Sequence, residues 1–331
     1  MVNGRSLSLS ATVERWPIAG IFAISRGAKT EAAVVVATLS DGSFTGRGEC
    51  VPYPRYGESV EAVAATIEAL QSDIRNGLDR AGLQSVIKPG AARNALDCAF
   101  WDLEAKRTGR RAYELAGLAP PRPQVTAFTI SLAEPDVMAQ ATARVADRKL
   151  LKIKLGTPGD PARIAAVRKA APDTTLIVDA NEGWTMDNLV ENINACARAD
   201  VALIEQPLPA DADAVLADTK RAVPICADES AHDLASLAAL VNKYDAVNIK
   251  LDKTGGLTEA LAMADEARKL KLDIMAGCMV ATSLAMAPAV LLAQRARYVD
   301  LDGPLLLAHD RENGLRYEGS LVHPADAVLW G

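Results

Sequence analysis

The sequence predicts an α/β fold in which a barrel of parallel strands follows a smaller α+β region. At 331 residues, the chain has room for about two domains, or for one barrel with an attachment, at ~150 residues per domain. After residue 122, short apolar runs alternate with Ala-rich helical stretches, and we count eight runs with about seven helices between them. This alternation is typical of parallel strands, and eight units are the number that closes a barrel. An open doubly wound sheet is the structural alternative, although no GxGxxG follows an early strand.

The region before residue 122 has a different pattern. Residues 32–39 are mostly apolar and precede Asp41-Gly42, which indicates antiparallel strands joined by tight turns. Helices are expected over residues 60–74 and 90–108. The Pro-rich residues 118–123 are the expected linker.

The expected barrel strands share short apolar runs bounded by turn residues. In chain order they are residues 125–132, 151–155, 176–180, 203–205, 225–228, 247–251, 274–277 and 298–301.

Composition excludes several classes of partner. The formal net charge is -6, from 36 basic and 42 acidic residues, and no basic run is interleaved with aromatic residues. We therefore expect neither nucleic acid nor a membrane as a partner. The most apolar later segment, residues 280–293, is too short to span a bilayer. Five cysteines without a CxxC pair favour a reducing, cytoplasmic location over a disulfide framework.

Charged residues recur near the carboxyl ends of the expected strands, where barrel enzymes carry their active sites. They are Lys152, Lys154, Asp179, Glu205, Asp228, Lys250, Asp300 and Asp302. From Lys154 to Lys250 the steps are 25, 26, 23 and 22 residues, about one βα unit each. Side chains alternate along a strand, so the lysines of residues 151–155 lie opposite the aliphatic residues and point into the barrel. A single charge at a strand end usually solubilises the protein or forms an ion pair, but this repeated set favours one converging site.

The set of candidate ligands is rich in oxygen. Three carboxylates without a cluster of thiols or imidazoles suit Mg²⁺. Zinc is disfavoured, because His232, His309 and His323 are far apart in the sequence.

The lysines suggest proton transfer. Mutual repulsion between Lys152 and Lys154, together with a nearby metal, is expected to lower the pKa of one of them. Lys250 would approach from the opposite side of the barrel. Two opposed bases around a metal-held carboxylate substrate can remove an α-proton from one face and return a proton to the other.

The ordered motifs resemble those of the enolase superfamily, muconate-lactonising-enzyme subgroup, and most closely those of dipeptide epimerases. The motifs are LKIKLG from Leu151, DANEGW from Asp179, IEQPL from Ile204, ADES from Ala227, NIKLDKTGG from Asn248 and DLDG from Asp300. The resemblance implies a (β/α)7β TIM-like barrel at residues 123–310. It also implies an α+β capping domain at residues 1–122, to which residues 311–331 return.

The same resemblance implies a set of functional residues. One Mg²⁺ per subunit would be held by Asp179, Glu205 and Asp228. Lys154 and Lys250 would be the acid/base catalysts, and Lys152 would contact the substrate carboxylate. Asn181 and Glu229 would support the metal ligands.

The resemblance also implies how a dipeptide would be recognised. Asp300 and Asp302 would bind its free ammonium group. Arg26, in an expected mobile loop at residues 25–30, would bind the side-chain carboxylate of a terminal glutamate, because a guanidinium can grip a carboxylate with two donors. Arg55, in a second cap loop, is the competing candidate.

The expected activity is that of an isomerase that epimerises a dipeptide, with Ala-Glu as the expected substrate. One alternative is an N-acylamino-acid racemase, for example of N-acylglutamate. Others are a muconate cycloisomerase, an o-succinylbenzoate synthase or a catalytically silent binding barrel. A homo-oligomer is compatible with a barrel of this size.

Overall fold

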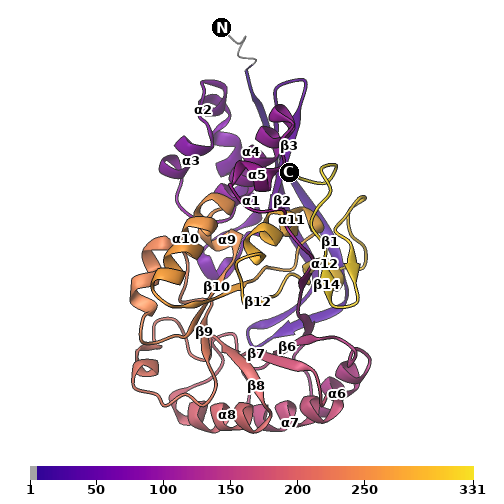
Figure 1. Ribbon diagram of the computed structural model, residues 1–331, viewed down its shortest axis with the longest axis vertical. Helices are drawn as coiled ribbons and strands as arrows, with labels where there is room; N and C mark the ends of the chain where they lie inside the picture. Colours follow the sequence, from indigo (N-terminus) through magenta and orange to yellow (C-terminus); the bar gives the residue numbers. More distant parts are fainter. Residues whose placement is uncertain (1–5) are drawn as a thin grey trace.

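The structure is a computed structural model that describes residues 6–331. Its centre is a curled sheet of eight parallel strands in the order β12-β11-β10-β9-β8-β7-β6-β5 (Figure 1). The strands are β5 (Phe128–Ile130), β6 (Leu150–Lys154), β7 (Thr175–Asp179), β8 (Val201–Glu205), β9 (Ile225–Ala227), β10 (Ala246–Ile249), β11 (Asp273–Ala276) and β12 (Tyr298–Val299). Ala127 N donates to Val299 O over 2.8 Å, which joins the two edges of the sheet. The predicted barrel is confirmed.

The first predicted barrel strand, residues 125–132, is divided in the structure. Gln124–Val125 (β4) pairs with β14 (Leu321–Val322), which in turn pairs with β13 (Tyr317–Glu318). Only Phe128–Ile130 pairs with β6. The separation occurs because Thr126 N donates to Ser320 O, whereas the next amide, of Ala127, turns to the barrel.

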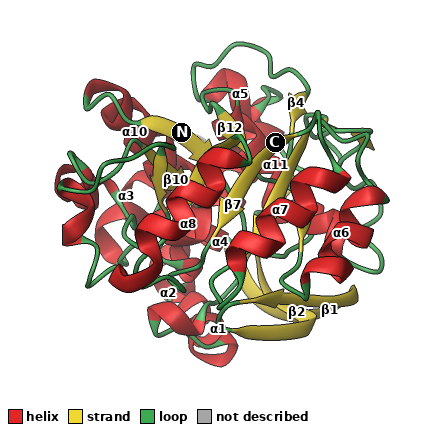
Figure 2. Ribbon diagram, turned by 90° about the horizontal axis from the view of Figure 1, so that it is seen from below, coloured by secondary structure: helices red, strands yellow, loops and turns green. Residues whose placement is uncertain are grey.

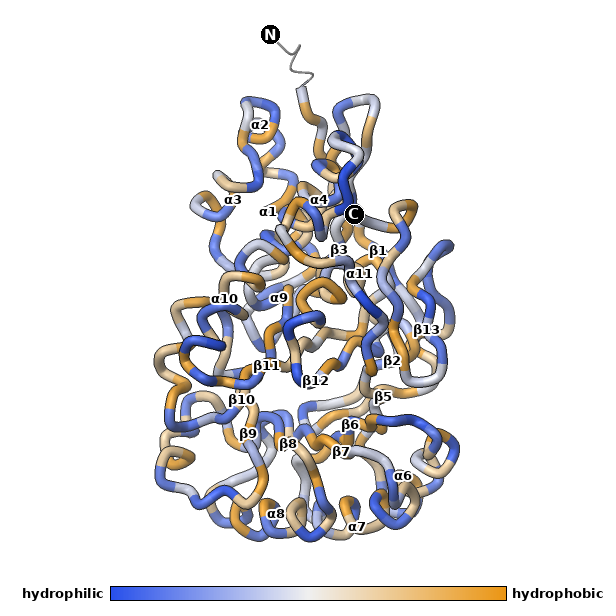
Figure 3. The backbone as a smooth tube through the Cα atoms, in the orientation of Figure 1, coloured by the Kyte–Doolittle hydropathy of each residue, from blue (hydrophilic) through white to orange (hydrophobic). Residues whose placement is uncertain are grey.

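Helices cover the outside of the barrel (Figure 2). They are α6 (Pro135–Ala143), α7 (Asp160–Ala170), α8 (Met186–Arg198), α10 (Leu257–Lys269) and α11 (Ser283–Ala293). Two short helices lie instead at the carboxyl ends of strands, where α9 (Leu251–Thr254) follows β10 and α12 (Gly303–Leu306) follows β12. Two of the predicted crossover helices are instead short 3₁₀ segments, η2 (Ala214–Ala217) and η3 (Leu234–Leu240). In Figure 3 the strands β6 and β7 are mainly hydrophobic, as expected for parallel strands covered on both faces. No helix in residues 6–331 is both long enough and apolar enough to cross a membrane.

A separate antiparallel sheet stands above the barrel mouth. It contains β1 (Ser8–Ile24), β2 (Gly27–Ser40) and β3 (Thr45–Cys50). The helices that follow this sheet in the chain are η1 (Pro54–Tyr56), α1 (Val60–Ala69), α2 (Gln71–Arg75), α3 (Arg80–Val86), α4 (Ala91–Thr108) and α5 (Ala112–Leu115). The single helix predicted over residues 60–74 is broken at Leu70. Gly48 allows α4 to pack closely on β3, since a Cβ there would lie 2.1 Å from Ala95 O.

The end of the chain packs against the same α+β region (Figure 1). Trp330 is 1% exposed, and its Nε1 donates to Cys98 O on α4 over 3.0 Å. Gly331 N donates to Asp102 Oδ1 over 2.8 Å. Ala112 N donates to Gly331 O over 2.9 Å. Both ends of the described chain therefore contribute to one packed unit.

Asp252 is a buried carboxylate that joins this unit to the barrel. Its Oδ1 accepts hydrogen bonds from Val51 N over 2.9 Å and from Asn94 Nδ2 over 2.8 Å. Burial raises the pKa of Asp252 to about 7, and the two hydrogen bonds offset only part of this rise. The folded protein thus binds more protons at this site than the unfolded chain between about pH 4 and pH 7.

The Asp252→Asn variant is expected to reveal this pH dependence. Because the folded pKa is the higher one, the Asp252 carboxyl makes the wild type less stable as pH rises, and asparagine does not titrate. Relative to the variant, the wild type should lose about 3 kcal/mol of unfolding free energy between pH 5 and pH 8. Urea unfolding at both pH values measures the difference. An equal stability gap at pH 5 and pH 8 would contradict the expectation.

Candidate active site

Three carboxylates lie side by side at the carboxyl ends of adjacent strands. Asp179 and Glu205 are the last residues of β7 and β8 and are register partners. Asp228 directly follows β9. All three are at most 1% exposed. Burying three acidic groups without compensating charge would be very costly, so their partners decide the chemistry of the site.

The two lysines of β6 supply part of the compensating charge. Lys152 Nζ lies 2.7 Å from Glu205 Oε2, 2.7 Å from Asp300 Oδ2 and 3.1 Å from Asp179 Oδ2. Lys154 Nζ lies 2.6 Å from Asp179 Oδ2. Both lysines therefore point into the barrel, in agreement with the alternation predicted for residues 151–155.

Lys250 faces them from the other side. It follows β10, which is four strands from β6 in a sheet of eight and hence across the barrel. Its Nζ lies 2.7 Å from Asp228 Oδ2. A second lysine, Lys253, lies 2.6 Å from Asp228 Oδ1 and also donates to Asn248 O. Sequence reasoning missed Lys253, although its spacing of three from Lys250 places both in one turn of chain.

Repulsion from Lys154 does not lower the pKa of Lys152 below its ordinary value. Burial lowers the pKa of Lys152, but Asp300, Glu205 and Asp179 raise it by more, so the pKa is well above its ordinary value. Conversely, burial raises the pKa of Glu205 to about 7, with Asp179 adding to the rise. The surrounding carboxylates therefore have a larger effect on the pKa of Lys152 than the neighbouring Lys154 has.

The three carboxylates have the oxygen chemistry that a hard divalent cation requires. Within residues 6–331, no three His, Cys, Asp or Glu side chains form a ready-made metal cage. The ammonium group of Lys152 lies between two of the carboxylates, 3.1 Å from Asp179 Oδ2 and 2.7 Å from Glu205 Oε2. Among the described residues, the buried Glu205 Oε2 accepts no well-directed hydrogen bond and has only the charge contact with Lys152 Nζ. Asn248 Nδ2 orients the same side chain by donating to Glu205 Oε1 over 2.7 Å. The residues present therefore fit Mg²⁺.

A second pair of carboxylates lies beside Lys152. Asp302 Oδ2 accepts a hydrogen bond from Thr129 N over 2.6 Å. Burial, and then the charge of Asp300, raise the pKa of Asp302 to about 7. The buried Asp300 Oδ1 accepts no hydrogen bond among the described residues. Two repelling carboxyl groups with an unused oxygen suit a ligand cation.

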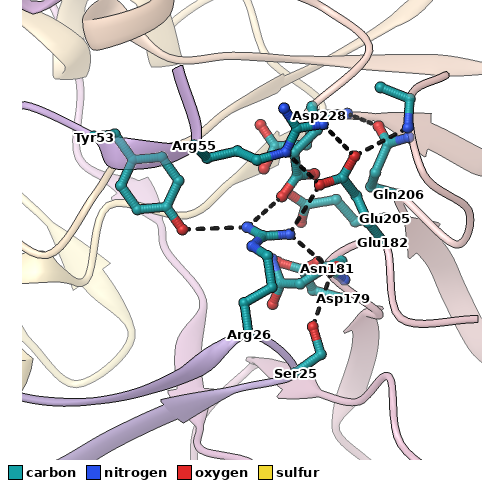
Figure 4. A network of polar contacts seen from close by, with 12 residues as sticks. Ser25, Arg26, Tyr53, Arg55, Asp179, Asn181, Glu182, Glu205, Gln206 and Asp228 are labelled. Carbon is teal, nitrogen blue, oxygen red and sulfur yellow. Dashed lines mark hydrogen bonds and ion pairs between the residues drawn. The ribbon is translucent and has the colours of Figure 1, made fainter. Parts of the chain in front are cut away.

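The β1–β2 hairpin reaches over the barrel mouth. The mobile loop predicted at residues 25–30 is instead a two-residue turn, because Ile24 and Gly27 are already strand partners. Ser25 Oγ donates to Asn181 O over 2.9 Å, and Arg26 Nη1 donates to the same oxygen over 2.7 Å. This turn therefore touches the loop that follows β7 (Figure 4).

The side chain of Arg26 is held by several acceptors (Figure 4). Nη1 also contacts Glu182 Oε2 over 3.2 Å, and Nη2 donates to Tyr53 OH over 3.2 Å and to Glu229 Oε1 over 2.7 Å. Four of its five N–H donors are thus used by the protein. The competing candidate, Arg55, forms two 2.8 Å hydrogen bonds with Glu182.

Sequence reasoning missed Glu182, which binds both candidate arginines. It lies directly after Asn181, and both residues have positive φ values, 64° and 46°, which are uncommon outside glycine. Glu182 Oε1 also accepts a hydrogen bond from Ala210 N over 2.9 Å. This backbone turn projects one carboxylate towards two separate segments of the cap.

Several of these charged groups line a cavity of about 430 Å³ between the barrel and the hairpin, whereas Asp179 and Glu205 are not among its lining residues. This volume lies within the range of about 300–1,000 Å³ found for small-molecule sites. Lys152, Lys154, Lys250, Asp300 and Asp302 all line it. Apolar residues of the hairpin and of the β11 loop complete its wall, among them Phe22, Ile24, Cys278 and Met279. The cavity is therefore lined by charged residues at its base and by both charged and apolar residues at its mouth.

Two family models match this architecture. Residues 7–117 match the N-terminal domain of the mandelate racemase / muconate lactonizing enzyme family, and residues 136–327 match the enolase C-terminal domain-like model. The chain belongs to this family of the enolase superfamily.

Relatives with known activities and structures cover almost the whole chain. The L-Ala-D/L-Glu epimerase of Escherichia coli is 46% identical over 94% of this chain and 97% of its own length. The N-acetyl-D-glutamate racemase of Pseudoalteromonas is 44% identical over 90% and 95%. An Agrobacterium tumefaciens enolase family member with homology to dipeptide epimerases, solved with sodium and L-Ala-L-Glu, has a TM-score of 0.97 at 60% identity, covering 98% of this chain and 100% of that one.

Proposed function

We propose that this protein is an isomerase that inverts the α-carbon of the C-terminal residue of a dipeptide, with L-Ala-D/L-Glu as the substrate and Mg²⁺ as the cofactor. The observation that carries the proposal is the opposition of Lys154 and Lys250 across the barrel, with buried carboxylates between them. The E. coli epimerase and the L-Ala-L-Glu complex support the choice of substrate. An Enterococcus faecalis dipeptide epimerase solved with Mg and L-Leu-L-Tyr supports the choice of metal.

Asp179, Glu205 and Asp228 are the proposed ligands of one Mg²⁺ per subunit. When bound, the ion would supply positive charge against the second negative charge that the substrate carboxylate gains on loss of its α-proton. Asn181 and Glu229 are proposed to support these ligands. Asn181 N already donates to Asp179 Oδ1 over 2.9 Å.

The proton transfer is assigned to two lysine nitrogens. For one stereoisomer, Lys154 Nζ takes the α-proton, and the electrons of the broken C–H bond move into the carboxylate group. Lys250 Nζ then gives a proton to the opposite face of the same carbon. Lys152 Nζ contacts the carboxylate and adds a fixed positive charge beside it.

Asp300 and Asp302 are the proposed partners of the ammonium group of the dipeptide. The second candidate activity, racemisation of an N-acylglutamate, is favoured by the 44% identical N-acetyl-D-glutamate racemase. An N-acylamino acid has no ammonium group, so it would leave these two carboxylates without a ligand cation. The aspartate pair therefore separates the two activities.

Deuterium incorporation from D₂O with Mg²⁺, measured by mass spectrometry, tests both candidates. L-Ala-L-Glu should gain one deuterium at the α-carbon of glutamate, and Asp302→Asn should lower this rate at least about tenfold, since a charged hydrogen bond is lost. The variant should exchange N-acetylglutamate at an unchanged rate. Equal rates on L-Ala-L-Glu for wild type and variant would remove the dipeptide argument, and no exchange on either compound would overturn both activities.

The division of the chain and its location are also proposals. We divide it into residues 1–122 as a cap, of which residues 1–5 lie outside the described part, 123–310 as a barrel and 311–331 as a segment that returns to the cap. The contacts of Trp330 support this return. All five cysteines are free, which supports a reducing, cytoplasmic location. Arg26 stays our prediction for a contact with the side chain of the substrate.

A further inference from the structure

In the wall of the active-site cavity, one basic side chain has no carboxylate partner among residues 6–331. Within residues 6–331, the basic residues that line the cavity and form ion pairs are Arg15, Arg26, Lys152, Lys154 and Lys250. Lys29 also lines the cavity, but it has no carboxylate partner in this part of the chain. Its Nζ lies 5.2 Å from the centre of the Tyr53 ring, a cation–π contact.

The strand register connects Lys29 with the reaction centre. Lys29 on β2 is the direct antiparallel partner of Phe22 on β1. Direct partners project to the same face of a sheet, with Cβ atoms about 5 Å apart. The Phe22 ring centre lies 5.7 Å from Lys154 Nζ. Lys29 therefore stands on the hairpin face that is turned towards a proposed catalytic lysine.

Most N–H donors of Arg26 are bonded within the protein, so a second cationic group is needed to bind both oxygens of a substrate carboxylate. Asn181, Glu182, Tyr53 and Glu229 occupy the four N–H donors of its two terminal nitrogens, so only the Nε–H is left for a ligand. The grip with two donors expected from sequence would require breaking one of these contacts. A carboxylate bound through one Arg26 donor keeps a second oxygen for another cation.

We propose that Lys29 is a specificity-determining residue, whose ammonium group binds the side-chain carboxylate of the C-terminal residue of the substrate. The inference rests on the proposed epimerase function and deepens it. Tyr53 positions both cations, because its ring faces Lys29 and its hydroxyl accepts a hydrogen bond from Arg26. An acidic side chain is thereby preferred over its neutral amide isostere.

Steady-state epimerisation of L-Ala-L-Glu and L-Ala-L-Gln tests this role. Lys29→Met should lower kcat/KM for L-Ala-L-Glu about tenfold or more, mainly through KM, because a charge-assisted hydrogen bond is lost. It should leave kcat/KM for L-Ala-L-Gln within about twofold. Lys29→Arg should restore the preference for the acidic dipeptide. Lys220→Met removes the same charge from an exposed loop residue outside the cavity and should change neither substrate.

The outcomes separate this inference from the function on which it rests. An active wild type whose Lys29→Met variant loses both dipeptides equally, or neither, would overturn the role of Lys29 and leave the epimerase function standing. A wild type that exchanges no α-proton of any dipeptide would overturn the proposed function and this inference with it. A selective loss of L-Ala-L-Glu in Lys29→Met, absent in Lys220→Met, supports it.

Discussion

Replacing Lys250 with methionine is expected to lower kcat for epimerisation of L-Ala-L-Glu by about 10³-fold, because one of two opposed proton carriers is lost. The fold should survive, since Asp228 keeps its 2.6 Å ion pair with Lys253. Lys154 is untouched in this variant. One stereoisomer of the dipeptide should therefore still exchange its α-proton with D₂O, whereas inversion stops.

The matched variant, Lys154→Met, should show the mirror pattern. It should lower kcat for inversion by the same factor. Only the opposite stereoisomer should still exchange its α-proton. Mass spectrometry of each purified stereoisomer after incubation in D₂O measures both variants. If the two variants exchanged the same stereoisomer, the lysines would not act on opposite faces of the α-carbon.

Chelation of divalent cations by EDTA is expected to reduce epimerisation by about 10³-fold, with recovery on addition of Mg²⁺. The reason is electrostatic, since the charge that develops on the substrate carboxylate needs several kcal/mol of stabilisation. Binding to the folded state also raises stability, by about 2.7 kcal/mol at a ligand concentration of 100 Kd. Mg²⁺ should thus raise the Tm of the wild type.

The Glu205→Gln variant separates metal binding from activity. It removes one proposed ligand charge but keeps the side-chain length, so the rise in Tm with Mg²⁺ should be smaller or absent. Glu318→Gln, at an exposed surface ion pair, is the control and should keep the full rise. An equal rise in wild type and Glu205→Gln would show that Mg²⁺ does not use Glu205.

The barrel and the inward charges could be predicted because both are periodic. Apolar runs separated by helical stretches predict parallel strands, and alternation within residues 151–155 places two lysines on one face. The structure confirms both inferences, with Lys152 and Lys154 directed into the barrel. Local periodicity also places Asp179 and Glu205 at equivalent strand ends.

Contacts between distant segments could not be predicted in the same way. Arg26 and Glu182 are 156 residues apart, and Arg55 and Glu182 are 127 apart. No pattern within one element predicts such a meeting. The sequence predicts a loop at residues 25–30, where the structure has a hairpin turn, because polar residues such as Ser25 and Lys29 are found both in loops and in exposed strands.

The contact between the last residues and α4 has a consequence for the order in which the molecule is completed. Trp330 is made 232 residues after Cys98, whose carbonyl it binds. During synthesis, this side of α4 stays exposed to water until the whole barrel has been translated. Contacts of such long sequence separation slow folding. Final closure of the cap should therefore be a late event, following assembly of the barrel on which catalysis depends.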